Sequence, residues 1–152
     1  MSAPNALASA SVLVVEDQTF VRDLLERLLT SLPVAQVAAA RSAEDALALL
    51  DKSPEMAHVA LVDYELPGIN GIQLIERLRG SSHRTLRDLP VIMLTSHNDV
   101  SLYQDAVRLG ISAFLAKPAG TTALKAALED ALSGRRVAPP VAQAQSATVR
   151  SS

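Results

Sequence analysis

The sequence predicts an α/β fold in which helices cover both faces of a parallel sheet. Short apolar runs and amphipathic segments alternate five times along the 152 residues, an order typical of strand–helix units. The run Val59–Val62 is apolar at every position, as expected for a strand that is buried on both faces. Four of the apolar runs end in acidic, hydroxyl or basic residues, and open α/β sheets carry their functional groups at this end of the strands.

Each strand is predicted from a short apolar run, and each helix from apolar residues at helical spacing near a capping or stopping residue. The predicted strands are Ser11–Val15, Val34–Ala40, Val59–Val62, Pro90–Leu94 and Ser112–Ala116. The predicted helices run from Phe20 to Leu32 before Pro33, from the Ser42 cap to Ser53, from Ile72 to Arg79 before Gly80, from Asn98 or Asp99 to Leu109, and from Thr121 or Thr122 to Leu132.

Two assignments within these segments bear on the surface of the molecule. In the first helix, Phe20 and Leu24 fall on the apolar face and Arg22 on the polar face. The polar segment Ser81–Asp88 is expected to be a loop with exposed arginines.

Composition indicates the domain boundaries, the location and the partner classes of the protein. Residues 1–10 lack basic residues and a long apolar run, so we expect a flexible N-terminus rather than a signal peptide. Residues 11–133 form the predicted domain, and residues 134–152, which show no periodicity, are expected to be a disordered tail. No run approaches the roughly 18 apolar residues of a membrane span. The net charge of −2 favours neither nucleic acid nor an anionic membrane, so we expect a cytoplasmic protein with neither as partner.

The predicted topology brings three carboxylates together. Five strands joined by right-handed crossovers favour the doubly wound, flavodoxin-like (βα)5 arrangement with strand order 2-1-3-4-5. Glu16 and Asp17 follow the first strand and Asp63 follows the third, on either side of the point where the strand order reverses. Three neighbouring acids repel one another unless a cation offsets their charge, and Mg²⁺ takes carboxylate ligands of this kind.

The other two strand ends carry groups suited to a phosphoryl group. Thr95 offers a hydroxyl donor and Lys117 a positive charge on a flexible stem. Phosphoryl transfer needs positioning and charge neutralisation, and an aspartate such as Asp63 can act as the nucleophile. Each residue also has an ordinary structural explanation: an acid pair at a helix start, a strand-end cap or a solvated turn. The joint order of acid pair, acid, hydroxyl and lysine favours the functional interpretation.

Four motifs extend this interpretation to a family. They are Val-Val-Glu-Asp at 14–17, Val-Asp-Tyr-Glu-Leu-Pro-Gly-Ile-Asn-Gly at 62–71, Met-Leu-Thr-Ser at 93–96 and Phe-Leu-Ala-Lys-Pro at 114–118. Over about residues 11–132 the chain resembles the receiver domain of bacterial two-component response regulators, in the stand-alone form related to chemotaxis regulators.

The resemblance implies a role for each residue of the cluster. Glu16, Asp17 and Asp63 would hold Mg²⁺, or Mn²⁺, together with the backbone carbonyl of Glu65. Asp63 would accept a phosphoryl group from the phosphohistidine of a histidine kinase or histidine phosphotransfer protein, and Thr95 and Lys117 would bind the phosphoryl oxygens.

The resemblance also implies switching and tuning residues. Phe114, with Thr95, matches the family's switch pair, and the Lys117–Pro118 bond matches a cis peptide. From its position on the helix before the fifth strand, Tyr103 is expected on a surface that phosphorylation reshapes, with a lone surface aromatic as the simpler explanation. Glu65 and His97 occupy positions that tune the phosphoryl group's lifetime, although His97 has a simpler explanation as a polar loop residue.

Several alternatives remain at this stage. A flavin-binding flavodoxin shares the predicted fold, but the acids after the first strand would repel the cofactor phosphate. A haloacid-dehalogenase-type phosphatase also uses an aspartate nucleophile, but this nucleophile follows the first strand. The favoured interpretation is a signalling phosphoacceptor rather than an enzyme, whose output is contact with an unknown downstream protein, a phosphorelay step or a phosphate sink. The chain could also be a receiver fragment of a larger regulator.

Overall fold

The computed structural model describes residues 3–96 and 100–137. Its centre is one parallel sheet with strand order β2-β1-β3-β4-β5, as the sequence predicts. The strands are β1 (Ser11–Val15), β2 (Gln36–Ala40), β3 (Val59–Asp63), β4 (Val91–Thr95) and β5 (Ala113–Ala116). Because every pairing is parallel, the carboxyl ends of all strands lie at the same edge of the sheet.

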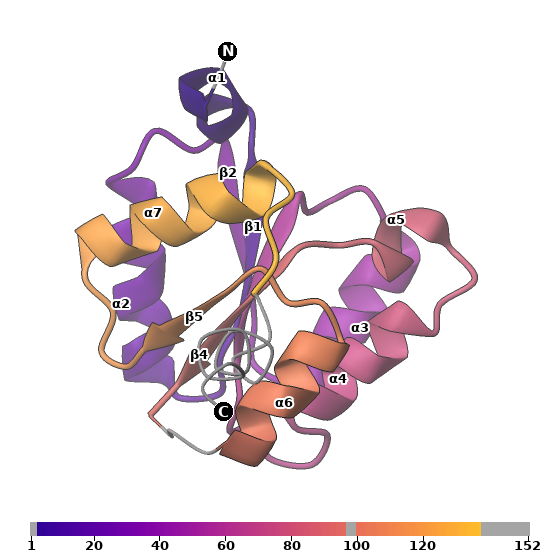
Figure 1. Ribbon diagram of the computed structural model, residues 1–152. Helices are drawn as coiled ribbons and strands as arrows, with labels where there is room; N and C mark the ends of the chain where they lie inside the picture. Colours follow the sequence, from indigo (N-terminus) through magenta and orange to yellow (C-terminus); the bar gives the residue numbers. More distant parts are fainter. Residues whose placement is uncertain (1–2, 97–99, 138–152) are drawn as a thin grey trace, which may run out of the picture.

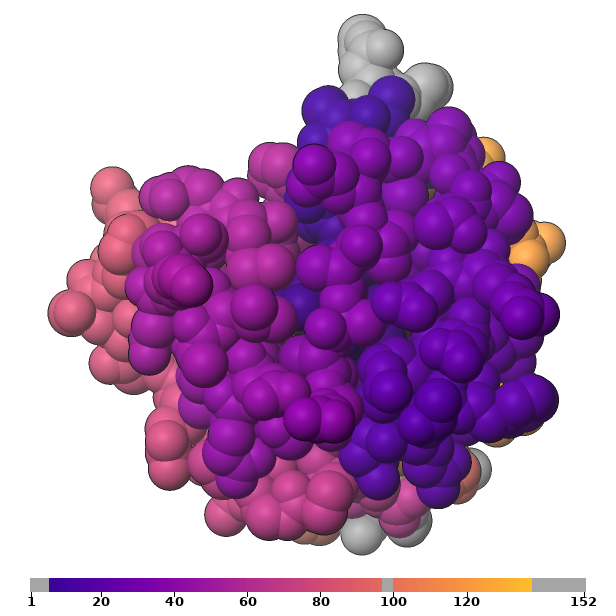
Figure 2. All heavy atoms as spheres, turned by 180° about the vertical axis from the view of Figure 1, so that it is seen from behind, coloured from indigo at the N-terminus to yellow at the C-terminus, as the bar shows by residue number. Residues whose placement is uncertain are grey.

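Helices cover both faces of this sheet (Figure 1). They are α1 (Ala3–Ala8), α2 (Thr19–Thr30), α3 (Ala43–Lys52), α4 (Gly71–Arg79), α5 (Arg84–Arg87), α6 (Val100–Arg108) and α7 (Thr121–Leu132). Figure 1 shows α2 and α7 on one side and α3, α4 and α6 on the other. From behind, the first half of the chain, including α2 and α3, covers most of the visible surface (Figure 2).

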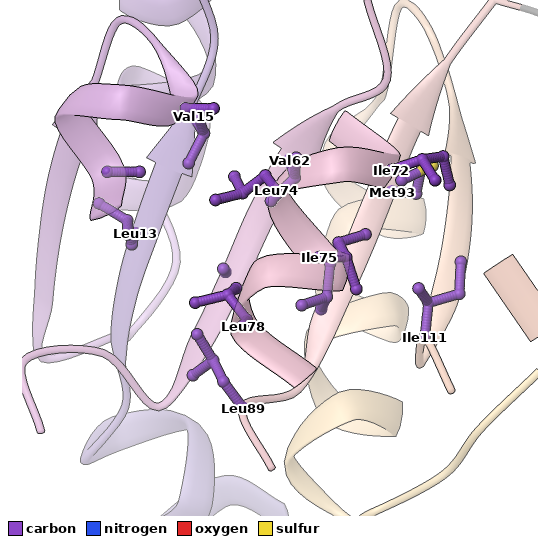
Figure 3. Close-up of a cluster of buried hydrophobic side chains, with 14 of the residues drawn as sticks. Leu13, Val15, Val62, Ile72, Leu74, Ile75, Leu78, Leu89, Met93 and Ile111 are labelled. Atoms are coloured by element: carbon purple, nitrogen blue, oxygen red, sulfur yellow. The ribbon is translucent and has the colours of Figure 1, made fainter. Parts of the chain in front are cut away.

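The core consists of two apolar clusters separated by the sheet. Along β1, Val12 and Val14 join the cluster beneath α2 and α7, whereas Leu13 and Val15 join the one beneath α3, α4 and α6. Alternation of this kind follows from the two-residue period of a strand. Figure 3 shows the second cluster, in which Leu74, Ile75 and Leu78 of α4 pack towards the sheet. Both faces of β3 are therefore shielded from solvent, and all five of its residues are buried.

The N-terminus differs from the predicted flexible segment. Residues Ala3–Ala8 form a short helix, and Leu7 is only 1% exposed, within the cluster that also contains Leu128 and Ala131 of α7. Burial of this side chain stabilises the helix against the domain, because an isolated helix of this length is unstable in water.

Smaller differences concern turns and helix ends. The segment 81–88, expected to be a loop, contains the short helix α5, which buries Leu86. The cap of α7 is Gly120, with no side-chain cap bond, rather than Thr121 or Thr122. Phe20 is 78% exposed and Leu24 38% exposed, although helical spacing places both on the apolar face of the helix.

The chain following α7 returns to the sheet. The Val137 backbone N–H donates to the carbonyl of Ile111 at 3.0 Å, and Arg136 Nη1 donates to the carbonyl of Gly110 at 2.8 Å. The first residues of the predicted disordered tail, up to Val137, are therefore bound to the turn between α6 and β5. The prediction for residues 138–152 lies outside the described residues, as do His97 and the caps Asn98 and Asp99.

Candidate functional site

The predicted site residues meet at the carboxyl edge of the sheet. Glu16 and Asp17 directly follow β1, and Lys117 directly follows β5. Asp63 and Thr95 are the last residues of β3 and β4, one step earlier relative to the strand ends than the sequence suggested. The Lys117 N–H donates to the Thr95 carbonyl at 3.1 Å, which joins the last two strand ends.

Three carboxylates form the centre of the site. One oxygen from each of Glu16, Asp17 and Asp63 lies within 4.8 Å of the others. Glu16 is 0% exposed and Asp63 1% exposed, while Asp17 is half-buried at the solvent side. Buried like charges at this separation are unfavourable unless a cation or a proton compensates them.

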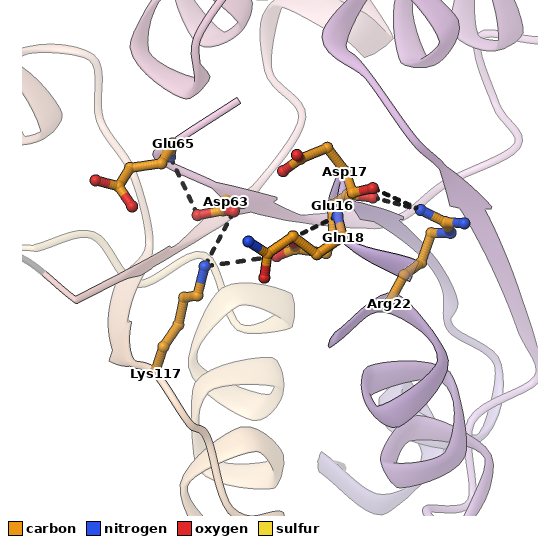
Figure 4. A network of polar contacts seen from close by, with 7 residues as sticks. All are labelled: Glu16, Asp17, Gln18, Arg22, Asp63, Glu65 and Lys117. Atoms are coloured by element: carbon orange, nitrogen blue, oxygen red, sulfur yellow. Dashed lines mark hydrogen bonds and ion pairs between the residues drawn. The ribbon is translucent and has the colours of Figure 1, made fainter. Parts of the chain in front are cut away.

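Lys117 supplies part of that compensation. Its Nζ donates to Asp63 Oδ2 at 3.1 Å and lies 3.7 Å from Glu16 Oε1 (Figure 4). The lysine side chain is 20% exposed, so this contact is only partly screened by water. The ammonium group therefore lies between the two most deeply buried acids.

Backbone amides hold the same two acids from the other side. Glu65 N–H donates to Asp63 Oδ1 at 3.1 Å, so both oxygens of Asp63 have a donor. Gln18 N–H donates to Glu16 Oε2 at 3.1 Å. The side chain of Glu65 is exposed above the site.

Burial shifts the protonation of this cluster. Desolvation raises the pKa of Glu16 to about 7, and the neighbouring charge of Asp63 adds to the rise. Burial also lowers the pKa of Lys117, but the hydrogen bond and charge of Asp63, with the charge of Glu16, outweigh it and hold that pKa above its ordinary value. Glu16 thus titrates near neutrality while Lys117 stays protonated.

The turn after β3 is shaped by Gly71 and by a capping box that the sequence analysis missed. The Asn70 side chain accepts from the Gln73 N–H, and the Gln73 side chain accepts from the Asn70 N–H, each at 2.9 Å. A Cβ on Gly71 would lie 2.6 Å from the Asp63 carbonyl oxygen, so this glycine lets α4 begin directly against the Asp63 backbone. The Asn-x-x-Gln spacing was a readable signal for the capping box.

The acids fit a hard divalent cation. Oxygen ligands from carboxylates are those that Mg²⁺ prefers. Glu16 Oε1 is buried beside Asp17 and Asp63, and among the described residues it accepts no hydrogen bond and has only the ion pair with Lys117 at 3.7 Å, so a cation could take it as a ligand.

The remaining predicted residues lie around this centre. Thr95 is 6% exposed, and the Lys117–Pro118 bond is cis, as the resemblance implied. Phe114 is half-buried and stacks on Tyr103, with ring centroids 5.0 Å apart and planes at 21°. His97 lies outside the described residues.

Comparisons with known proteins agree with this geometry. The family model of the response regulator receiver domain matches residues 12–129. A chemotaxis protein CheY homolog of Campylobacter jejuni is 30% identical over 121 residues, which cover 80% of this chain and 91% of that protein. The transcriptional regulatory protein FixJ of Bradyrhizobium diazoefficiens is 32% identical over 135 residues, covering 88% of this chain and 60% of FixJ.

A solved structure shows the same architecture. The chemotaxis response regulator CheY4 of Vibrio cholerae is 25% identical, with a TM-score of 0.70 over 80% of this chain and 97% of that one. Within the part of the chain that the structure describes, no helix has the length and apolar character to cross a membrane. The chain belongs to the response regulator receiver family, the phosphoacceptor domains of two-component signalling.

Proposed function

We propose that Asp63 is the phosphoryl acceptor of this receiver. The observation that carries the proposal is the environment of its carboxylate, which is buried at a strand end and held by Lys117 at 3.1 Å and by the Glu65 N–H at 3.1 Å. Both contacts fix the orientation of the nucleophile before a donor arrives, and positioning is the main requirement of phosphoryl transfer. Of the three acids, Asp63 is the one whose carboxylate accepts the hydrogen bond of the Lys117 ammonium group.

The donor in this proposal is the phosphohistidine of a histidine kinase or histidine phosphotransfer protein. A carboxylate oxygen of Asp63 forms a bond to phosphorus as the phosphorus–nitrogen bond breaks, and the electron pair returns to the imidazole. Lys117 and the Thr95 hydroxyl then bind oxygens of the transferred group. The protein is a phosphoacceptor in the cytoplasm, and its output is a protein contact, a relay step or a sink.

Glu16, Asp17 and Asp63 would hold Mg²⁺ in this scheme, with the Glu65 carbonyl as a further ligand. The ion would supply positive charge to offset that of the acids and the phosphoryl oxygens. The chain itself orients the ligands, and its buried surroundings strengthen the electrostatic interactions between those charges.

Two further assignments remain proposals. Thr95 and Phe114 form the switch pair, with the ring of Phe114 stacked on Tyr103 of α6 in the present conformation. Glu65 and His97 tune the lifetime of the phosphoryl group. Replacement of His97 by alanine should change the decay rate several-fold and flatten its dependence between about pH 6 and 8, where histidine titrates. If the phosphoryl-group decay curves of the parent protein and the alanine variant superimpose, His97 has no role in this tuning.

The acceptor is tested by replacing its carboxylate while keeping its shape. Asp63→Asn should not gain a phosphoryl group from acetyl phosphate and Mg²⁺, as read by intact mass and by hydroxylamine-sensitive labelling. Asp51→Asn, which changes an exposed aspartate of α3, is the matched control and should be labelled like the parent protein. An acyl phosphate formed on the Asp63→Asn protein would refute the assignment.

A further inference from the structure

Arg22 contacts the two acidic residues through their backbone rather than through their carboxylates. Its Nη1 donates to the Glu16 carbonyl at 3.0 Å and to the Asp17 carbonyl at 3.3 Å. Nη2 reaches the Thr19 hydroxyl at 3.5 Å. Figure 4 shows the guanidinium beside these carbonyls, on the side opposite to the Asp17 carboxylate. The sequence pattern had assigned Arg22 only to the polar face of the helix.

These two carbonyls belong to the peptide planes on either side of the Asp17 Cα. Fixing both planes fixes the backbone dihedral angles of Asp17, and hence the direction of its Cα–Cβ bond. The cap residue of α2, Gln18, makes no side-chain cap bond, and its carbonyl accepts a hydrogen bond from the Arg22 N–H at 2.8 Å. Arg22 is therefore a clamp on this turn.

Asp17 needs such a clamp more than the other two acids do. The Glu16 carboxylate is held by the Gln18 N–H, and that of Asp63 by the Glu65 N–H and Lys117. Among the described residues, none donates a hydrogen bond or forms an ion pair to the carboxylate of Asp17. The direction of the Asp17 carboxylate towards the cluster is therefore set by the Asp17 backbone.

We propose that Arg22 is a positioning residue, which aims the Asp17 carboxylate at the cation site by binding the backbone carbonyls of Glu16 and Asp17. This inference rests on the proposed function, since it gives Asp17 the role of a metal ligand. It extends the site from its acids to a side chain that touches neither the ion nor the phosphoryl group. Groups that orient metal ligands from outside typically change metal affinity by about 10- to 100-fold when they are removed.

Because Arg22 is positively charged, the direction in which Mg²⁺ affinity changes on its removal separates two explanations of its role. If the guanidinium acted only through its charge, its removal would make the site more negative and Mg²⁺ would bind more tightly. If it acts as a clamp, its removal should weaken binding although the repulsion is relieved. The two explanations therefore predict opposite changes in the dissociation constant.

Mg²⁺ titrations of the unphosphorylated protein, followed by calorimetry and by amide NMR signals of residues 16–18 and 63–65, measure this change. Arg22→Met keeps most of the apolar stem and should weaken binding roughly tenfold. Arg22→Lys keeps the charge but not the planar fork, and should also bind more weakly than the parent protein. Arg27→Met, which removes the same charge from an exposed position of α2, is the control and should bind Mg²⁺ at least as tightly as the parent.

Tighter or unchanged binding by Arg22→Met would overturn the proposal. The parent protein and Asp17→Asn are titrated first, so that failure of the metal site itself is recognised separately. A second measurement, the HN–Hα scalar couplings that report the backbone φ of Asp17 and Gln18 in metal-free protein, does not depend on the ion. They should indicate one φ in the parent protein and averaging in Arg22→Met, and couplings that are the same in both would also overturn the proposal.

Discussion

Replacing Gly71 by alanine tests whether the start of α4 sets the position of the acceptor. The new Cβ would lie 2.6 Å from the Asp63 carbonyl oxygen and 2.9 Å from the Tyr64 Cα. Relief requires the first contact to lengthen to at least 3.0 Å, and the atoms that must move are backbone. The Gly71 N–H also donates to the Tyr64 carbonyl at 3.0 Å, so moving the helix away weakens that bond.

The energetic cost follows from these contacts. Overpacking of this kind costs about 1–3 kcal/mol, and exchange of glycine for alanine within a helix returns up to about 1 kcal/mol. We expect a net loss of about 1–2 kcal/mol, which corresponds to a melting temperature lower by roughly 2–8 °C for a domain of this size. Such a loss leaves the protein folded at room temperature, given an ordinary stability of about 5–15 kcal/mol.

The effect on phosphorylation should be larger than the effect on folding. Misplacement of a reacting group by about 1 Å can lower a rate by about 100-fold, so a shift of several tenths of an ångström should lower it by roughly 5- to 10-fold. The assay is the initial rate of acetyl phosphate labelling at saturating Mg²⁺, with the melting temperature measured in parallel.

Gly80→Ala, at the other end of α4, is the matched control. Its Cβ would meet the Glu76 carbonyl at 3.4 Å and the Arg77 carbonyl at 3.8 Å, which are ordinary van der Waals contacts, and its φ is −89°. It should label at the parent rate and gain about 0.4–1 kcal/mol of stability. Labelling of Gly71→Ala at the parent rate would refute the reasoning, whatever its melting temperature.

Three further predictions concern charge, metal and the N-terminal helix. Because burial raises the pKa of Glu16 from 4.5 to about 7, its contribution to stability is fully present below pH 4.5 and is lost as pH rises to about 7. In metal-free denaturation curves, Glu16→Gln should therefore flatten this part of the profile, and an unchanged slope would contradict it. Chelation by EDTA should stop labelling, and restoration by Mg²⁺ should fail in Asp17→Ala; full labelling in chelated samples would count against the metal site. Leu7→Ala should cost about 2–5 kcal/mol in urea denaturation, as other core truncations do, whereas the exposed Ala6→Ser should cost little.

The sequence contained most of what sets the sheet and the cluster. Strand order and the convergence of Asp63, Thr95 and Lys117 follow from local apolar runs and from the residues that end them. Parallel pairing then places these strand ends at one edge of the sheet. The chemical roles of these residues stay predictions. What the sequence could not show depends on contacts between distant segments, such as the burial of Leu7 beside α7.

The length of side chains was a second limit on what the sequence could predict. Helical spacing places Phe20 on the apolar side of α2, yet it lies at the helix start, beyond the edge of the core, and is exposed. The same spacing places Arg22 on the polar side, but its long stem folds back to the preceding turn, half-buried. A pattern gives the direction of a Cβ atom, and it does not give the position of a guanidinium several bonds further on.

The attachment of Val137 and Arg136 to the turn between α6 and β5 couples the segment after α7 to that turn. Val137 lies beside the N-terminal end of β5, because its backbone N–H binds Ile111 and the Arg136 side chain binds Gly110. A displacement of that turn would therefore be transmitted to residues 136 and 137 and, along the main chain, to the end of α7. A fluorescent label introduced at Ser133, just before this segment, would make the attachment usable as an intramolecular gauge of the α6–β5 turn.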